Sequence, residues 1–266
     1  MITATTATKP LTLSEIKKVA PSVFAEAPHK SRSERYSMVK TVDMIQNFEK
    51  TGWYPARVTE ERSAKYKGFQ RHQVAFRQDF TAQKYVPEIL FLNSHNGRTK
   101  CVFKLGIFRL VCSNGLVRQT MSMGSASAIH VGINQSEFVK KLDHYVIQAN
   151  ETIKEIRKYE SVALDDSQRM SFAITALKTV YPERFDQIAP ASLLEVRRDV
   201  DNETDLWTTF NVVQENIIKG GLQYVIPRDS ANDRNARTKP ITNIHRNNAV
   251  NMVLWALMAE FYTKVK

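Results

Sequence analysis

Residues 88–113 read EILFLNSHNGRTKCVFKLGIFRLVCS, and this stretch sets the fold class of the chain. Two runs of mostly apolar residues flank Ser94-His95-Asn96-Gly97, and an Asn-Gly pair between such runs is a strong signal for a β-hairpin. A second pair of alternating runs, residues 53–60 and 70–80, lies upstream around the polar turn at Tyr66-Lys67-Gly68. We therefore predict a mainly antiparallel, four-stranded sheet in the first half of the chain.

The spacing of apolar residues changes after residue 132. They recur every three or four positions from about Gln135 to Tyr159, which predicts a long amphipathic helix lying across the sheet. The same test predicts helices at 166–179, 191–198, 205–219 and 246–264. The expected fold class is α+β: an N-terminal, mainly antiparallel sheet covered by a long helix, followed by a mostly helical C-terminal half.

These patterns divide the chain into three parts, which could also form one continuous domain. Residues 1–40 are expected to be an N-terminal arm, residues 41–160 a basic core of sheet and helix, and residues 161–266 a helical region. Within the last part, residues 224–246 hold hardly any apolar side chain, so we expect a long basic loop there. The same composition also suits a solvated linker between two helices.

The surplus positive charge of the chain lies in its first half. Residues 1–133 contain 20 Lys and Arg against 9 Asp and Glu, whereas residues 134–266 contain 18 of each kind. Basic residues alternate with aromatic ones there, as at Arg35-Tyr36 and Tyr66-Lys67. Phosphates attract cations and unstacked bases can lie on rings, so this pattern favours single-stranded nucleic acid as the partner. Half-exposed strands of any basic protein would show the same alternation.

Candidate contact residues combine a cation, ring or amide with the tight-turn residues that let a backbone approach an anion. The turn holding Asn93 and His95 could bind a phosphate or a base edge, or its side chains could bond their own backbone. Arg109 could be exposed on its strand or be a buried ion-pair partner. The predicted nucleic-acid-binding residues are Arg35, Tyr36, Tyr66, Lys67, Asn93, His95, Arg109, Lys219, Arg234, Arg237 and Lys239.

The sequence shows no familiar catalytic signature. It contains no Gly-x-x-x-x-Gly-Lys-Ser/Thr loop, no His-Glu-x-x-His and no Gly-x-Ser-x-Gly, and its six histidines are scattered. We therefore predict no catalytic residue, no metal site and no cofactor, and we favour a binding protein over an enzyme. No run of about eighteen apolar residues and no secretory signal is present, so we expect a cytoplasmic protein that does not bind membranes.

Several blocks of sequence resemble a phage- and plasmid-associated family known only as domain of unknown function 932. They occur in the order of that family between about Pro21 and Tyr262, and they include Ser33–Tyr36, Leu92–Gly97, Gly106–Leu116, Trp207–Phe210 and Lys219–Gly221. The resemblance implies residence on a mobile element in a bacterial cytoplasm. It implies no particular activity.

The order of elements and the basic, aromatic-rich half also resemble in outline the β-β-β-α core of the single-strand annealing recombinases that phages carry. On this resemblance we expect a homo-oligomeric protein that binds single-stranded DNA and assists annealing in recombination. Two alternatives remain open. One is a protein-binding inhibitor of host defence, and the other is a metal-dependent nuclease whose site is assembled from distant residues, including Asp79 and His95.

Overall fold

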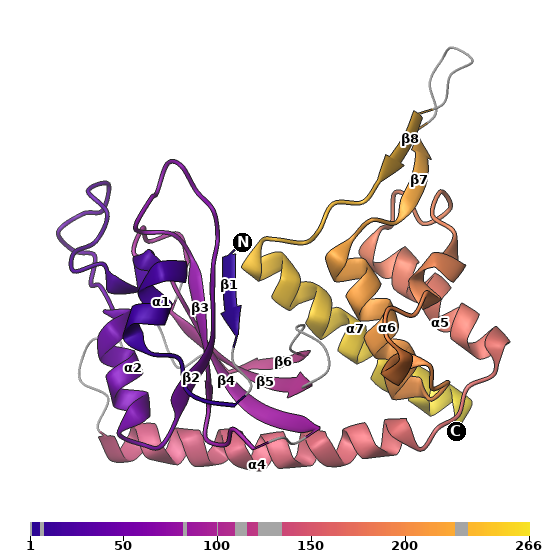
Figure 1. The fold of residues 1–266 in the computed structure, drawn as a ribbon, viewed down its shortest axis with the longest axis horizontal. Coiled ribbons are helices and arrows are strands. Elements are labelled where there is room, and N and C mark those ends of the chain that lie inside the picture. The colour runs from indigo at the N-terminus through magenta and orange to yellow at the C-terminus, as the bar shows by residue number, and fades with distance from the viewer. Residues whose placement is uncertain are drawn as a thin grey trace. The chain divides into compact units, whose positions relative to one another are not determined.

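A computed structural model describes residues 2–5, 8–81, 84–99, 101–109, 116–121, 135–226 and 234–266. The chain forms two compact units, Met1–Glu151 and Thr152–Lys266. The first unit contains an antiparallel sheet, and the second is mainly helical (Figure 1). The α+β class predicted from the sequence is therefore confirmed.

Among the described residues of the first unit, six strands form one sheet, and each strand pairs with the one that follows it in the sequence. All of these pairings are antiparallel, so the chain runs through the sheet as a meander. Both predicted hairpins are present, and one further strand extends the sheet on each side. The strands are β1 (Ile2–Thr5), β2 (Tyr54–Glu60), β3 (His72–Arg77), β4 (Tyr85–Asn93), β5 (Val102–Arg109) and β6 (Leu116–Met121).

An aromatic cluster forms the core on one face of this sheet. Helix α2 (Thr41–Glu49) packs Phe48 against Phe76 of β3 and Phe103 of β5, with ring centroids 4.1 and 5.7 Å apart. The long helix α4 (Gln135–Glu160) forms as predicted. Most side chains in its first turns lie outside the described residues, so its position across the sheet stays a prediction.

Residues 1–40, predicted as an N-terminal arm or as part of one continuous domain, lie within the first unit. Strand β1 pairs with β2, and helix α1 (Leu13–Val19) buries Ile16 completely. The short 3-10 helix η1 (Pro21–Phe24) follows and buries Val23. The sequence shows only a few apolar residues in this stretch, but each of these two fills a core position.

Helix α6 (Leu206–Lys219) is the central helix of the second unit. Every residue from Leu206 to Ile218 is buried, as expected for a helix surrounded by others. Trp207 and Trp255 both lie in this core. The surrounding elements are α5 (Asp166–Val180), η2 (Pro190–Leu194), η3 (Asp199–Asp201) and α7 (Ile244–Val265). In the part of the chain that the structure describes, no helix is both long and apolar enough to span a bilayer.

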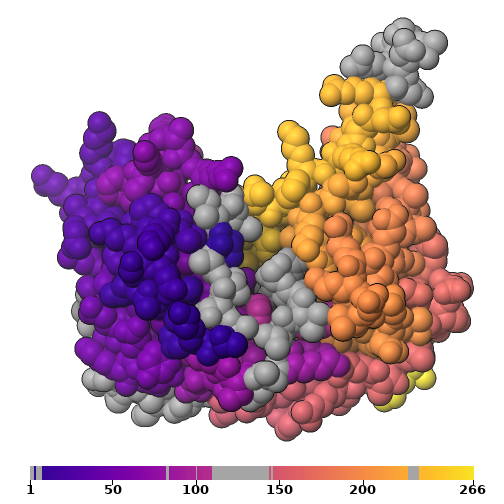
Figure 2. All heavy atoms as spheres, viewed as in Figure 1, coloured from indigo at the N-terminus to yellow at the C-terminus, as the bar shows by residue number. Residues whose placement is uncertain are grey.

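The basic segment 224–246 is only partly a loop, which corrects the prediction for this segment. Strands β7 (Gln223–Ile226) and β8 (Arg234–Arg237) pair antiparallel and project from the helices of the second unit (Figure 1; Figure 2). Residues 227–233 lie outside the described residues. The ribbon is held by backbone hydrogen bonds rather than by a buried apolar face, so apolar periodicity could not predict it.

Candidate nucleic-acid interface

The turn between β4 and β5 is held by its own side chains and by α2. Asn93 donates from Nδ2 to the carbonyl of Val39 and to Thr41 Oγ1, both at 3.0 Å, and accepts at Oδ1 from the backbone N–H of Ser94. Asn96 Oδ1 accepts from the N–H of Arg98. This is the Asx-stabilised turn that the sequence left open as an alternative to a ligand-binding one.

Asn93 and His95 are both buried in this turn, at 3% and 0% exposure. This burial favours side chains that bond within the protein, and direct contact of Asn93 and His95 with nucleic acid stays a prediction. The turn also serves as an anchor. The backbone N–H of His29 donates to the carbonyl of His95 at 2.9 Å, and the Tyr36 hydroxyl donates to the carbonyl of Ser94 at 3.2 Å.

These two bonds fix the segment 28–36 against the end of the sheet. Arg35 is exposed beside the anchored Tyr36. Tyr36 is half-buried, and this burial raises the pKa of its phenol. Arg32 lies over Gly97, where a Cβ atom would meet Arg32 Cδ at 2.6 Å. Gly97 also has a φ of +69°, so both the backbone and the packing favour glycine there.

A third segment, residues 62–69, lies against the same place. The ring of His29 makes edge contacts with Tyr66 and Phe69, with centroids 5.1 and 5.2 Å apart. The Arg98 guanidinium and the Lys65 ammonium each lie 5.5 Å from the centre of the Tyr66 ring. Tyr66 is half-buried by these neighbours, whereas Lys67 is fully exposed.

We call residues 28–36, 62–69 and 97–98 the basic loop cluster. It holds seven Lys and Arg residues, and Glu34 is its one acidic residue. The exposed cations of the cluster are Lys30, Arg35, Arg62, Lys65, Lys67 and Arg98. Such a surface attracts polyanions, and the part-exposed Tyr66 ring adds a stacking group. The cluster brings together Arg35, Tyr36, Tyr66 and Lys67 from the predicted set.

A buried polar network lies beneath the cluster and was missed from the sequence. His72 of β3 places Nε2 at 2.8 Å from Thr41 Oγ1 and Nδ1 at 2.8 Å from Ser22 Oγ. His95 Nε2 lies 3.3 Å from the same Thr41 oxygen. Thr41 can therefore accept from Asn93 and His95 and donate to His72, which uses its full bonding capacity. The network joins η1, α2, β3 and the turn.

Burial keeps both histidines neutral. Desolvation lowers the pKa of His72 to about 3, helped by the proximity of His95, and lowers that of His95 to about 4. Glu60 lies beside the network and accepts from the N–H of Ser22 at 2.9 Å; burial raises the pKa of its carboxyl. One feature of the sequence could have indicated this network. His72 lies near the start of a predicted strand, and Asn93-Ser94-His95 lies at the end of the predicted strand next to it.

Arg109 lies at the opposite end of the sheet from the basic loop cluster. It pairs with Tyr85 across β4 and β5, whereas the cluster joins the end where Leu92 pairs with Val102. Arg109 is 5% exposed, which agrees with the alternative that it is buried rather than exposed on its strand. The structure does not bring Asp79 and His95 together, because Asp79 follows the far end of β3, whereas His95 is buried in the turn at the other end.

A second buried network crosses the middle of the sheet. Glu88 is fully buried and accepts from Arg57 at 2.6 Å and from Arg77 at 2.7 and 2.9 Å. The guanidinium of Arg77 also lies 3.8 Å from the centre of the Phe108 ring. Because both arginines bond the same carboxylate, the network links β2, β3 and β4, and the contact of Arg77 with Phe108 extends it to β5.

The remaining predicted residues belong to the second unit. Lys219 forms an ion pair with Glu215 one turn earlier in α6. Arg234 and Arg237 are exposed on β8, and Lys239 follows it. The role of Lys219-Gly220-Gly221 in approaching an anion stays a prediction, and the backbone that approaches Gly220 in the structure is that of Lys239. Among the described residues, no three His, Cys, Asp or Glu side chains come close enough to hold a metal ion.

The fold and the cluster together describe an α+β protein with a polyanion-attracting surface and no recognisable catalytic centre among the described residues. The chain belongs to the family described as "Domain of unknown function (DUF932)", whose model matches residues 28–251. It is similar to two Escherichia coli K12 proteins, UPF0380 protein YfjQ and UPF0380 protein YafZ. Each is 32% identical over 262 residues, which cover 97% of this chain and 94% of the relative. None of the solved structures matches the chain.

Proposed function

We propose that this protein binds single-stranded nucleic acid, with DNA as the favoured ligand, through the basic loop cluster. The observation that carries the proposal is the convergence of three segments, distant in sequence, that expose six cations around the half-buried Tyr66. Cations of this kind neutralise phosphates, and a ring among them can take an unstacked base.

The contacts of Tyr66 suggest how a base would enter. His29 holds one edge of the ring, and Arg98 lies over it. A base that stacks on Tyr66 replaces the Arg98 guanidinium, which is then free to pair with a phosphate. Tyr36 has a different task, since its hydroxyl is bonded to Ser94 and secures the segment that displays Arg35.

On this proposal the protein assists annealing or recombination of mobile-element DNA in the bacterial cytoplasm and acts as a homo-oligomer. Two features support the role. Antiparallel strands followed by a long helix agree in outline with the element order of single-strand annealing recombinases, and the first unit carries the surplus positive charge of the chain. Strand-annealing assays and light scattering of the DNA-bound protein test this part.

The binding test is a salt titration with single-stranded and duplex oligonucleotides. Log affinity should fall linearly with log salt, with a slope of about −0.7 per neutralised phosphate on single strands. The triple change Lys30→Ala, Arg35→Ala and Lys67→Ala removes three exposed side chains that make no hydrogen bond or ion pair with the described residues, so the slope should fall by about 2. The melting temperature should stay the same, because exposed charges contribute little to folding.

The matched control removes three exposed cations outside the cluster: Lys18, Lys50 and Lys158, each changed to Ala. It lowers the net charge equally and should leave the slope near that of the native protein. An equal loss of slope in both triple variants would show that binding depends on net charge alone. It would reject the basic loop cluster as the binding site. Undetectable binding at low salt would reject nucleic-acid binding and favour the alternative of a protein that binds a host defence factor. Cleavage of labelled DNA on addition of Mg²⁺ would favour the nuclease.

A further inference from the structure

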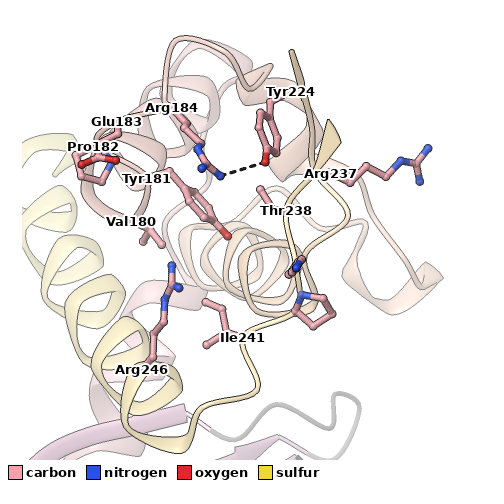
Figure 3. Close-up of a pocket in the computed structure, with 12 residues that line it drawn as sticks. Val180, Tyr181, Pro182, Glu183, Arg184, Tyr224, Arg237, Thr238, Ile241 and Arg246 are labelled. Carbon is pink, nitrogen blue, oxygen red and sulfur yellow. Dashed lines mark hydrogen bonds between the residues drawn. The ribbon is translucent and has the colours of Figure 1, made fainter. Parts of the chain in front are cut away.

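The second unit contains a cavity that none of the features above explains. Its volume is about 580 Å³, within the range of small-molecule sites. Three parts of the unit line it: residues 180–184 at the end of α5, Tyr224 with the segment 237–241 of the ribbon, and Arg246 in the first turn of α7 (Figure 3).

The lining of this cavity is strongly cationic. Arg184, Arg237, Lys239 and Arg246 contribute to it, and Glu183 is the one acidic residue among the described residues that line it. Figure 3 shows Arg184 reaching toward Tyr224 and Arg246 pointing toward Tyr181, whereas the guanidinium of Arg237 points away from them. The first turn of α7 has no acidic residue and carries Arg246. A cation there opposes the helix dipole, so it is unfavourable for the fold and favourable for an anion.

Two tyrosines give the cavity an aromatic wall. The Arg184 guanidinium lies 4.9 Å from the centre of the Tyr224 ring and donates to its hydroxyl at 3.1 Å. Tyr181 is half-buried, its hydroxyl donates to the carbonyl of Ile217 at 3.3 Å, and burial raises its pKa. Rings that are held in place beside arginines suit a ligand with both a flat base and a phosphate.

The position of the basic segment is fixed by a glycine pair at the end of α6. Gly220 has a φ of +66°, and a Cβ atom there would lie 2.7 Å from the backbone carbonyl carbon of Lys239. Gly221 donates to the carbonyl of Thr238 at 2.8 Å, and Ile241 donates to that of Ile218 at 2.9 Å. The segment that carries Lys239 is thus held by backbone bonds before any ligand arrives.

We propose that this cavity binds the phosphate and base of a nucleotide, either free or as the 5′-phosphorylated end of a strand. The proposal does not depend on the basic loop cluster, which belongs to the first unit. Arg184 and Arg246 supply charge-assisted hydrogen bonds to phosphate oxygens, and Tyr224 supplies the surface for the base.

The test is calorimetric titration of the full chain at low salt with ATP, AMP, inorganic phosphate and pyrophosphate. A second arm compares a 5′-phosphorylated dinucleotide with its 5′-hydroxyl form. The expected result is that a nucleotide or the phosphorylated dinucleotide binds, and that inorganic phosphate and pyrophosphate bind at least tenfold more weakly. Tight binding of AMP or ATP identifies a free nucleotide as the ligand, and a preference for the dinucleotide identifies a strand end.

Arg246→Ala should weaken this binding about tenfold or more, because one charge-assisted hydrogen bond is lost. The Arg246 side chain makes no hydrogen bond or ion pair within the described residues and opposes the dipole of α7, so the melting temperature should not fall. Arg157→Ala removes an exposed arginine of α4 in the same unit and should bind like the native protein. Three outcomes would overturn the proposal. They are no binding of any of the ligands, an equal loss of affinity in both variants, and binding of inorganic phosphate as tight as that of the nucleotides. The triple change at Lys30, Arg35 and Lys67 should leave nucleotide binding intact, which separates this test from that of the proposed function.

Discussion

Acidification should destabilise the first unit through its two buried histidines. Both are neutral in the folded protein, with pKa values of about 3 for His72 and about 4 for His95, whereas an unfolded histidine has a pKa of about 6.5. The folded-state pKa is lowered, so the stabilisation is fully present above pH 6.5. It is lost as the pH falls, because the unfolded chain then binds protons that the folded chain cannot.

The size of the effect follows from the difference between the folded-state and unfolded-state pKa values. A pH of 5 lies about 1.5 units below the pKa of a histidine in the unfolded chain, and each pH unit corresponds to about 1.4 kcal/mol. Both folded-state values still lie below pH 5, so each histidine accounts for a loss of about 2 kcal/mol and the pair for about 4 kcal/mol. Glu60 acts in the opposite direction, because burial raises the pKa of its carboxyl and acid therefore favours its folded form.

Hydrogen exchange of peptides from β3 and β4 reports the opening free energy of the first unit alone. The native chain should lose stability between pH 7 and pH 5, and His95→Gln should lose about 2 kcal/mol less over the same range. His144→Gln changes an exposed histidine and serves as the control, with the pH dependence of the native chain. An unchanged pH dependence in His95→Gln would refute the reasoning, since the protonation step would then lie elsewhere.

Three further changes test how each unit is held. Gly97→Ala should open the segment 28–36 to trypsin faster than Gly68→Ala does, because both positions have positive φ but only at Gly97 would the new Cβ displace Arg32. Gly220→Ala should lower the melting temperature more than Gly221→Ala and weaken nucleotide binding, since its Cβ would meet backbone that cannot swing aside. Glu88→Ala should destabilise the first unit by about 3–5 kcal/mol in urea denaturation, because it leaves two arginines without their carboxylate.

The sheet could be predicted from the sequence because each of its hairpins carries a local signal. Alternating runs around an Asn-Gly turn specify a hairpin with little help from distant contacts. The β7–β8 ribbon was missed because it carries no such signal. Its strands bury almost nothing, so no alternation of apolar residues marks them. The strand in residues 2–5 was not predicted, because its partner β2 lies some fifty residues away in the sequence.

The candidate site was predicted in part. Arg35, Tyr36, Tyr66 and Lys67 meet at one end of the sheet because three separate loops end there, and their composition already indicated exposed cations beside rings. Asn93 and His95 lie at the same end of the sheet, but they are buried and support the cluster from within the protein. Their burial depends on bonds to Thr41 and on the carbonyls offered to residues 28–36, which no spacing along the sequence reveals.

The charge surplus of the first half overstates the positive surface available to a ligand. Arg57 and Arg77 form ion pairs with Glu88 inside the sheet, and Arg109 is buried at the far end of the sheet. Lys104 is buried on β5, where desolvation lowers the pKa of its ammonium group. A buried cation neither reaches a phosphate nor releases counterions, so Arg77, Lys104 and Arg109 cannot contribute to a salt-dependent affinity, and the charge of Arg57 is paired with Glu88. Exposed charge is instead concentrated on loops secured by the neutral network of His72, Thr41 and His95, so binding and folding in this unit should share a dependence on pH.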